Sequence, residues 1–233
     1  MNQRIQELKK TVLEANLDLV KHELVILTWG NVSAYDPESG LVVIKASGID
    51  YDKMNVKHMT VTDLDGNIVE GEYKPSSDLP THLVLYKKFP GISSIIHTHS
   101  QFATMWAQAG KPIPCLGTTH SDYFCGEIPC TRKMTSKEIA DSYEENTGHV
   151  IVESFSDIDY NRVKAVLVHS HGPFVWGNTP DDAVHNSVVL EFISKMAFCN
   201  LEIAEGQPKS IQTELMLKHY NRKFGVDAYY GQK

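Results

Sequence analysis

Apolar residues recur at the spacing of an α-helix in several parts of the chain, with polar and charged residues between them. Near the N-terminus, Ile5, Leu8 and Val12 lie three or four positions apart, which predicts an amphipathic helix. Thr135 and Glu138 have the spacing of a capping box, so a further helix is expected to begin there. Longer helices are predicted over residues 3–22, 79–89, 101–109, 179–198 and 210–224.

Short apolar runs bounded by turn residues predict strands between these helices. The runs cover residues 24–28, 41–45, 59–64, 67–70, 92–97, 150–155 and 165–169. Asp65-Gly66 separates two of them and is typical of a tight hairpin turn, so at least part of the sheet is expected to be antiparallel. Strands in the middle, with helices before, between and after them, predict an α/β fold.

The composition changes this picture little, but it excludes some partners. The chain has 233 residues, of which 42% are hydrophobic and 22% are charged. It shows no compositional break, so a single domain that spans residues 1–233 is expected. A net charge of −7 argues against nucleic acid as the main partner, because phosphate binding over a large surface needs a basic face. A small anionic substrate is compatible with this charge, because a local pocket can be positive on an acidic protein.

No secretion or membrane insertion is expected. Residues 1–10 are polar and lack the apolar core of a signal peptide, and no stretch approaches the length of a membrane span. Cys115, Cys125, Cys130 and Cys199 have neither zinc-ribbon nor Cys-x-x-Cys spacing. Reduced thiols in a cytoplasmic enzyme are the expected state.

Two His-x-His motifs carry the clearest chemical signal. His97 and His99 end one apolar run, and His169 and His171 end another. Side chains two residues apart on a strand point to the same side, so each pair can present two imidazoles together. Three nitrogen ligands with one open position would suit a catalytic zinc ion. A single histidine at a strand end is more often structural, and the spacing leaves open whether His169 or His171 faces the metal.

Three short loops combine small residues with hydroxyl or amide groups and free backbone N–H groups, as phosphate sites do. They are Gly30-Asn31, Ser47-Gly48 beside Lys45, and Ser76-Ser77 before a predicted helix N-terminus. Asp78 follows the third loop and is either a helix cap or a carboxylate directed at a metal. Asp122 lies in a polar cluster and is either a base or part of an ordinary turn.

Taken together, these motifs resemble those of the L-ribulose-5-phosphate 4-epimerases, within the class II aldolase and epimerase family. The resemblance covers essentially the whole chain, and its Thr-Thr-His-x-Asp-Tyr run and Tyr-Tyr-Gly tail are specific to the epimerases. Ala46, where proline is expected, is a minor departure. The matching runs are residues 27–33, 45–48, 74–78, 97–100, 117–123, 128–132, 169–174 and 229–231.

The resemblance implies a single class II aldolase-like domain with a central, largely antiparallel sheet flanked by helices. It implies a zinc ion, or another divalent metal, held by His97, His99 and His171, with Asp78 close to or on the metal. It gives Asp122 and Tyr230 acid and base roles. It also implies a homotetramer in which the C-terminal tail reaches an active site at a subunit interface. The substrate phosphate is expected at Gly30, Asn31, Ser47, Gly48, Ser76 and Ser77.

The implied reaction interconverts L-ribulose 5-phosphate and D-xylulose 5-phosphate by breaking and remaking the C3–C4 bond, in L-arabinose or L-ascorbate catabolism. The first alternative is a class II sugar-phosphate aldolase, a group that resembles this chain but carries glutamate where this chain has Asp78. The second is an adducin-like interaction module on the same fold, which would be expected to lose metal ligands or the base. Asp78 favours the epimerase over the aldolases, and the presence of the histidines, Asp78 and Asp122 argues against the interaction module.

Overall fold

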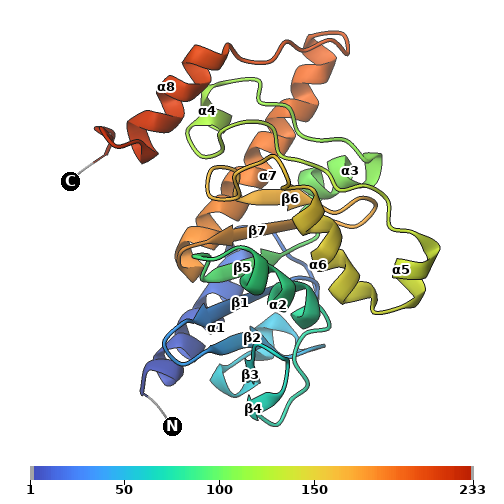
Figure 1. Ribbon diagram of the computed structural model, residues 1–233, viewed down its shortest axis with the longest axis vertical. Coiled ribbons are helices and arrows are strands. Elements are labelled where there is room, and N and C mark those ends of the chain that lie inside the picture. The colour runs from blue at the N-terminus through green and yellow to red at the C-terminus, as the bar shows by residue number, and fades with distance from the viewer. Residues whose placement is uncertain (1–2, 232–233) are drawn as a thin grey trace.

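The computed structural model describes residues 3–231 and contains one seven-stranded sheet in the order β4-β3-β2-β1-β5-β7-β6 (Figure 1). Every pairing between these strands is antiparallel. The expectation of an α/β fold with a largely antiparallel sheet is thus confirmed. The strands are β1 (Asn31–Asp36), β2 (Leu41–Lys45), β3 (Met59–Asp63), β4 (Ile68–Glu70), β5 (Ser94–His97), β6 (Ala165–Leu167) and β7 (Pro173–Gly177).

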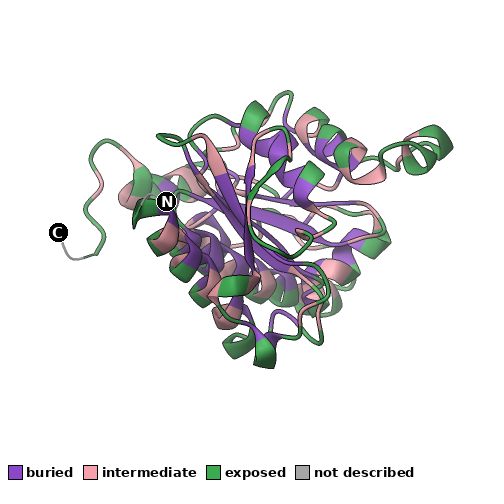
Figure 2. Cartoon of the chain, turned by 90° about the horizontal axis from the view of Figure 1, so that it is seen from below, coloured by how far each residue is buried: buried purple, intermediate pink, exposed green. Residues whose placement is uncertain are grey.

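Helices cover both faces of the sheet, so the buried strands run through the middle of the molecule and the exposed residues lie on the outer sides of the helices (Figure 2). The α-helices are α1 (Gln3–Lys21), α2 (Leu79–Lys88), α3 (Gln101–Ala109), α4 (Thr118–Ser121), α5 (Ser136–Ala140), α6 (Tyr143–Glu153), α7 (Pro180–Ile203) and α8 (Thr213–Phe224). Two short 3₁₀ helices, η1 (Tyr51–Lys53) and η2 (Val56–His58), join β2 to β3.

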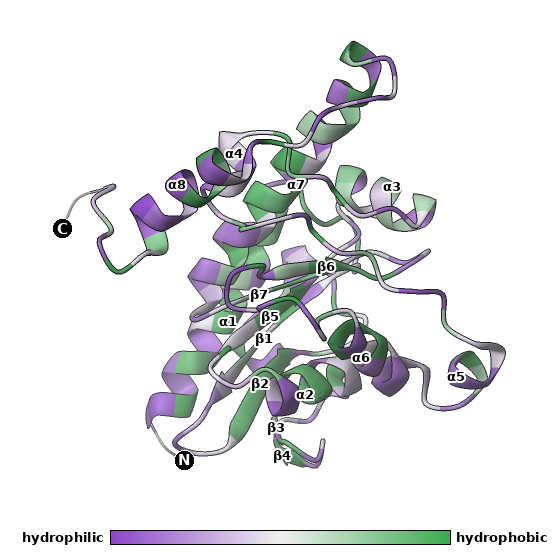
Figure 3. Cartoon of the chain, turned by 45° about the horizontal axis from the view of Figure 1, so that its top comes forward, coloured by the Kyte–Doolittle hydropathy of each residue, from purple (hydrophilic) through white to green (hydrophobic). Residues whose placement is uncertain are grey.

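The central strands separate two hydrophobic cores, because successive side chains point to opposite faces. In β5, Ile95 belongs to the core beneath α2 and α6, and Ile96 belongs to the core beneath α1. His97 therefore emerges on the same face as Ile95, at the end of its strand. Figure 3 shows the hydrophobic residues gathered on the strands and on the helix sides that face them.

Most predicted elements are present, but residues 150–155 do not form a strand. Residues 150–153 are the end of α6, whose buried residues include Thr147, Gly148, Val150 and Ile151, and residues 154–155 lie in the turn that follows. A short apolar run is equally compatible with a buried helix, and here the run belongs to a helix that packs against α2. Gly148 lets α6 approach α2 closely, since a Cβ there would lie 2.6 Å from the Cβ of Val84.

Residues 24–28 are also not a strand. Ile26 and Leu27 are 60% and 72% exposed, and Leu27 has a φ of 54°, so the chain turns here and does not pair. The neighbouring strand begins at Asn31 and was not predicted because it is polar. Its Ser33 is fully buried and its hydroxyl lies 2.7 Å from both His82 Nδ1 and Tyr86 Oη. Strand β7 also went unpredicted.

Between residues 3 and 231, no helix is both long enough and apolar enough to cross a membrane. The four cysteines are free thiols, in agreement with the expectation of reduced cysteines.

Candidate metal centre and active site

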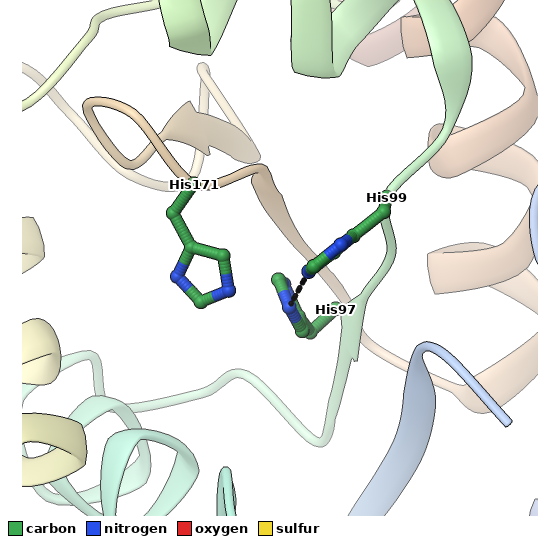
Figure 4. A group of neighbouring side chains, drawn as sticks. All are labelled: His97, His99 and His171. Atoms are coloured by element: carbon green, nitrogen blue, oxygen red, sulfur yellow. Dashed lines mark hydrogen bonds between the residues drawn. The ribbon is translucent and has the colours of Figure 1, made fainter.

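Three histidine side chains converge where strands β5 and β7 meet (Figure 4). His97 is the last residue of β5 and pairs with Phe174 of β7, while His99 follows it and His171 comes just before β7. The Nε2 atoms of His97 and His99 are 3.1 Å apart, and one nitrogen from each of the three rings lies within 4.8 Å of the others. Antiparallel pairing of two distant segments thus builds this cluster.

A tight turn before β7 selects His171 over His169. Ser170 adopts a left-handed conformation with a φ of 63°, and its N–H donates to the carbonyl of Ala107 at 2.8 Å. This reversal sends His171 toward His97. The ring of His169 lies instead against Gly110, the residue that follows α3, where a Cβ would lie 2.3 Å from Nε2 of His169. In this geometry His171, and not His169, joins the histidine cluster.

The donor set fits a divalent metal ion such as zinc. Two nitrogens bound to one tetrahedral zinc ion at about 2.0–2.1 Å lie ~3.3 Å apart, close to the separation of the His97 and His99 nitrogens. Nδ1 of His97 lies 3.0 Å from the carbonyl oxygen of Pro173 and donates to it, so its Nε2 carries the free lone pair. Burial lowers the pKa of His99, and burial together with the neighbouring histidines lowers the pKa of His171 to about 4. These rings are therefore neutral near pH 7, the form that binds metals.

A cavity of about 400 Å³ opens beside the three histidines. All six residues expected to hold the phosphate line it, although they come from three separate loops. Two backbone contacts join two of these loops. Ala46 and Pro75 form a β-bridge, and the N–H of Ser76 donates to the carbonyl of Lys45 at 2.9 Å. The predicted site residues that line the cavity are Gly30, Asn31, Ser47, Gly48, Ser76, Ser77, Asp78, His97, His99 and His171.

Asp78 directs its carboxylate into this cavity. It precedes α2, but its side chain makes no capping hydrogen bond, so the interpretation as a helix cap is wrong. Its Oδ2 accepts a hydrogen bond from Asn31 Nδ2 at 2.6 Å. Burial raises its pKa, but His97, His82 and the bond from Asn31 outweigh burial, so the pKa lies below its usual range. The carboxylate is ionised at neutral pH and lies outside the group of three histidine nitrogens.

Five further residues line the cavity that were not among the predicted site residues, namely Thr28, Trp29, Lys45, Tyr143 and Glu144. Lys45 supplies a buried positive charge, and its Nζ donates to the carbonyl of Thr28 at 3.2 Å. Burial lowers the pKa of this lysine. Tyr143 and Glu144 come from the start of α6. The sequence analysis noted Lys45 beside the Ser47-Gly48 loop, whereas no local pattern marks the α6 residues.

Asp122 and Tyr230 lie outside this cavity, in a separate cluster between α4 and α8. Arg222 connects them: its guanidinium lies 2.8 Å from Asp122 Oδ2 and 4.6 Å from the ring centroid of Tyr230. His219 Nδ1 is 3.1 Å from Asp122 Oδ1. Figure 1 shows α8 and the tail projecting from the body of the molecule. The structure therefore brings the two residues together, but not with the histidines of the same chain.

Comparisons with known proteins agree with this architecture. Residues 10–198 match the family model described as class II aldolase and adducin N-terminal domain. The chain is 52% identical, over 229 residues, to L-ribulose-5-phosphate 4-epimerase UlaF of Salmonella paratyphi A, covering 98% of this chain and 100% of that one.

Solved structures show the same fold. An L-fuculose 1-phosphate aldolase superposes with a TM-score of 0.78 at 27% identity, covering 93% of this chain and 95% of that one. The L-fuculose-1-phosphate aldolase of Thermus thermophilus has a TM-score of 0.67 at 20% identity, covering 86% of this chain and 98% of that one. The second likeness concerns the fold alone.

Proposed function

This chain belongs to the class II aldolase and adducin family, and we propose that it is a metal-dependent L-ribulose-5-phosphate 4-epimerase. The observation that carries the proposal is the convergence of three histidines beside a cavity lined by anion-binding loops, in a chain 52% identical to an enzyme of that name. The reaction would interconvert L-ribulose 5-phosphate and D-xylulose 5-phosphate. It would serve pentose catabolism in the cytoplasm, from L-arabinose or L-ascorbate.

His97, His99 and His171 would hold the metal, with Asp78 as the neighbouring carboxylate ligand. Zinc suits three neutral imidazoles and one carboxylate, and another divalent ion could replace it. When bound, the ion would act as a Lewis acid toward the oxygens on C2 and C3 of the substrate. Asn31 would keep the Asp78 carboxylate turned toward the histidines, since its amide already donates to that group.

The phosphate would bind at the loops Gly30-Asn31, Ser47-Gly48 and Ser76-Ser77. The N–H groups of Ser47 and Ser76 are already bonded to backbone carbonyls, so their hydroxyls are the available donors. The buried ammonium of Lys45 adds a positive charge in the same cavity. Hydrogen bonds from serine hydroxyls together with one ammonium group stabilise a dianionic phosphate.

The chemistry follows from the position of the inverted carbon. The hydrogen on C4 is not α to the C2 carbonyl, so its removal would leave a carbanion without resonance stabilisation. Instead, a base takes the proton of the C4 hydroxyl, the C3–C4 bond breaks, and the electron pair forms the enediolate of dihydroxyacetone beside glycolaldehyde phosphate. The aldehyde turns its other face, the enediolate carbon attacks it, and an acid on the opposite side protonates O4.

Asp122 and Tyr230 are the proposed acid–base pair. Since they lie outside the cavity of their own chain, we propose that a second copy of the chain supplies them, in a homotetramer with active sites at subunit interfaces. Mixing two inactive variants tests this directly. His97→Asn removes a metal ligand and Asp122→Asn removes the base, so a mixed oligomer would contain some intact sites and recover activity. Absence of recovery in verified mixed oligomers would exclude the shared site.

The decisive assay measures D-xylulose 5-phosphate formed from L-ribulose 5-phosphate by zinc-loaded protein, before and after chelation. Chelator-sensitive conversion is the expected result. Accumulation of free glycolaldehyde phosphate as the main product would instead indicate an aldolase, the activity named for the structural relative at 27% identity. A protein that binds no metal would favour an adducin-like binding module.

A further inference from the structure

We propose that Tyr143 is a positioning residue that holds the ring of His171 in the orientation needed for metal binding. The inference rests on the metal site of the proposed function. Tyr143 opens α6, and its hydroxyl oxygen lies 3.3 Å from Nδ1 of His171. The ring centroids of the two residues are 6.3 Å apart.

The contact is on the outer nitrogen of His171. In Figure 4 one ring nitrogen of His171 points toward His97 and the other points away from the cluster. Nδ1 is the nitrogen in contact with Tyr143, so Nε2 is the one left to bind a metal. A neutral imidazole that binds a metal through Nε2 keeps its proton on Nδ1. That N–H would then donate to the Tyr143 oxygen.

His97 and His171 are held differently. His97 is oriented by a backbone carbonyl, that of Pro173. His171 follows the left-handed Ser170, so its backbone comes from a turn and not from a strand. The side chain of Tyr143 contacts the outer nitrogen of His171. The ring orientation of His171 therefore depends on a side chain, which a substitution can remove.

The start of α6 is itself firmly placed. Ser142 has a φ of 53°, a conformation that non-glycine residues rarely adopt, and it directs the chain into the helix. The carbonyl of Tyr143 accepts from Thr147 Oγ1 at 2.9 Å, and that of Glu144 accepts from Thr81 of α2. The side chain of Asn146 donates back to the carbonyl of Glu138 at 3.1 Å. The backbone that carries the Tyr143 side chain is therefore held in place beside His171.

The test is the zinc affinity of Tyr143→Phe, measured by competition with a chromophoric chelator. Loss of such an outer hydrogen bond typically weakens metal binding by about 10- to 100-fold. The matched control is Tyr160→Phe, which removes a hydroxyl that donates to the carbonyl of Pro90 at 3.0 Å outside the cavity. The thermal midpoint of the metal-free protein is recorded for each variant.

We expect Tyr143→Phe to bind zinc at least about 10-fold more weakly than wild type, with an unchanged midpoint for the metal-free protein, while Tyr160→Phe binds as wild type does. Equal zinc affinity in Tyr143→Phe and wild type would overturn the inference and leave the metal site standing. A lowered metal-free midpoint with wild-type affinity would assign Tyr143 a purely structural role. Wild-type protein that binds no zinc would overturn the metal site and this inference together.

Discussion

Replacing Gly172 by alanine should push apart the two segments that carry the proposed metal ligands. Gly172 lies between His171 and β7, and its φ is not in the left-handed region, so alanine is compatible with its backbone. The added Cβ would lie 2.7 Å from the carbonyl oxygen of Thr98, 3.4 Å from His99 Cδ2 and 3.5 Å from His97 Cε1. The effect of the substitution is therefore steric and is directed at the segment that carries the other two ligands.

The size of the displacement can be worked out from these contacts. A carbon and a carbonyl oxygen approach to about 3.3 Å without repulsion, so one segment must move by ~0.6 Å. Metal–ligand distances tolerate changes of only about 0.2 Å. We therefore expect Gly172→Ala to weaken zinc binding at least ~10-fold and to destabilise the metal-free protein by ~1–3 kcal/mol, the usual effect of overpacking.

Chelator competition measures the affinity, and urea unfolding of the metal-free protein measures the stability. Gly117→Ala is the matched control, because Gly117 also has an ordinary φ and a Cβ there would meet nothing within 4 Å. Wild-type zinc affinity in Gly172→Ala would refute the claim that close approach of these two segments sets the metal geometry.

Three further predictions concern other parts of the chain. Asp122→Asn should reduce epimerase turnover ~10²–10⁴-fold while leaving zinc content unchanged, and normal turnover would remove Asp122 from the mechanism. Burial lowers the pKa of His120 to about 4, below its unfolded value of about 6.5, so its contribution to stability is complete above pH ~6.5 and is lost as the pH falls toward 4. His120→Gln should therefore flatten the pH dependence of the urea-derived unfolding free energy by up to ~3 kcal/mol over this range, and an unaltered dependence would contradict the assignment. Gly148→Ala, whose Cβ would lie 2.6 Å from the Cβ of Val84, should cost ~1–3 kcal/mol by forcing α6 away from α2, which urea unfolding would detect.

Local sequence determined the features whose causes are themselves local. The amphipathic pattern of α1 and the Asp65-Gly66 hairpin appear as predicted. The capping box of Thr135 and Glu138 also forms, because both partners lie within one turn of the same helix. The resemblance of short motifs to the epimerases was equally readable, and 52% identity to one of them confirms it.

Tertiary contacts decided the cases in which a short segment suits more than one environment. Residues 150–155 have a strand-like composition, but residues 150–153 end a helix that packs on α2. Strand β1 contains polar residues that would suit a loop, yet partners from α2 satisfy its buried Ser33. Neither outcome could be predicted locally, because burial depends on what the rest of the chain places against the segment.

The candidate site shows the same division. The sequence supplied the types of side chain in the candidate site, since both His-x-His pairs and all three loops are visible in it. The fold supplied their assembly: antiparallel pairing of β5 with β7 joins His97 to His171, and a left-handed Ser170 turns His169 away. Tyr143 comes from a segment with no motif at all and meets His171 because α6 packs beside the sheet. Contacts between residues far apart in the chain depend on the packing of whole elements, which no short pattern encodes.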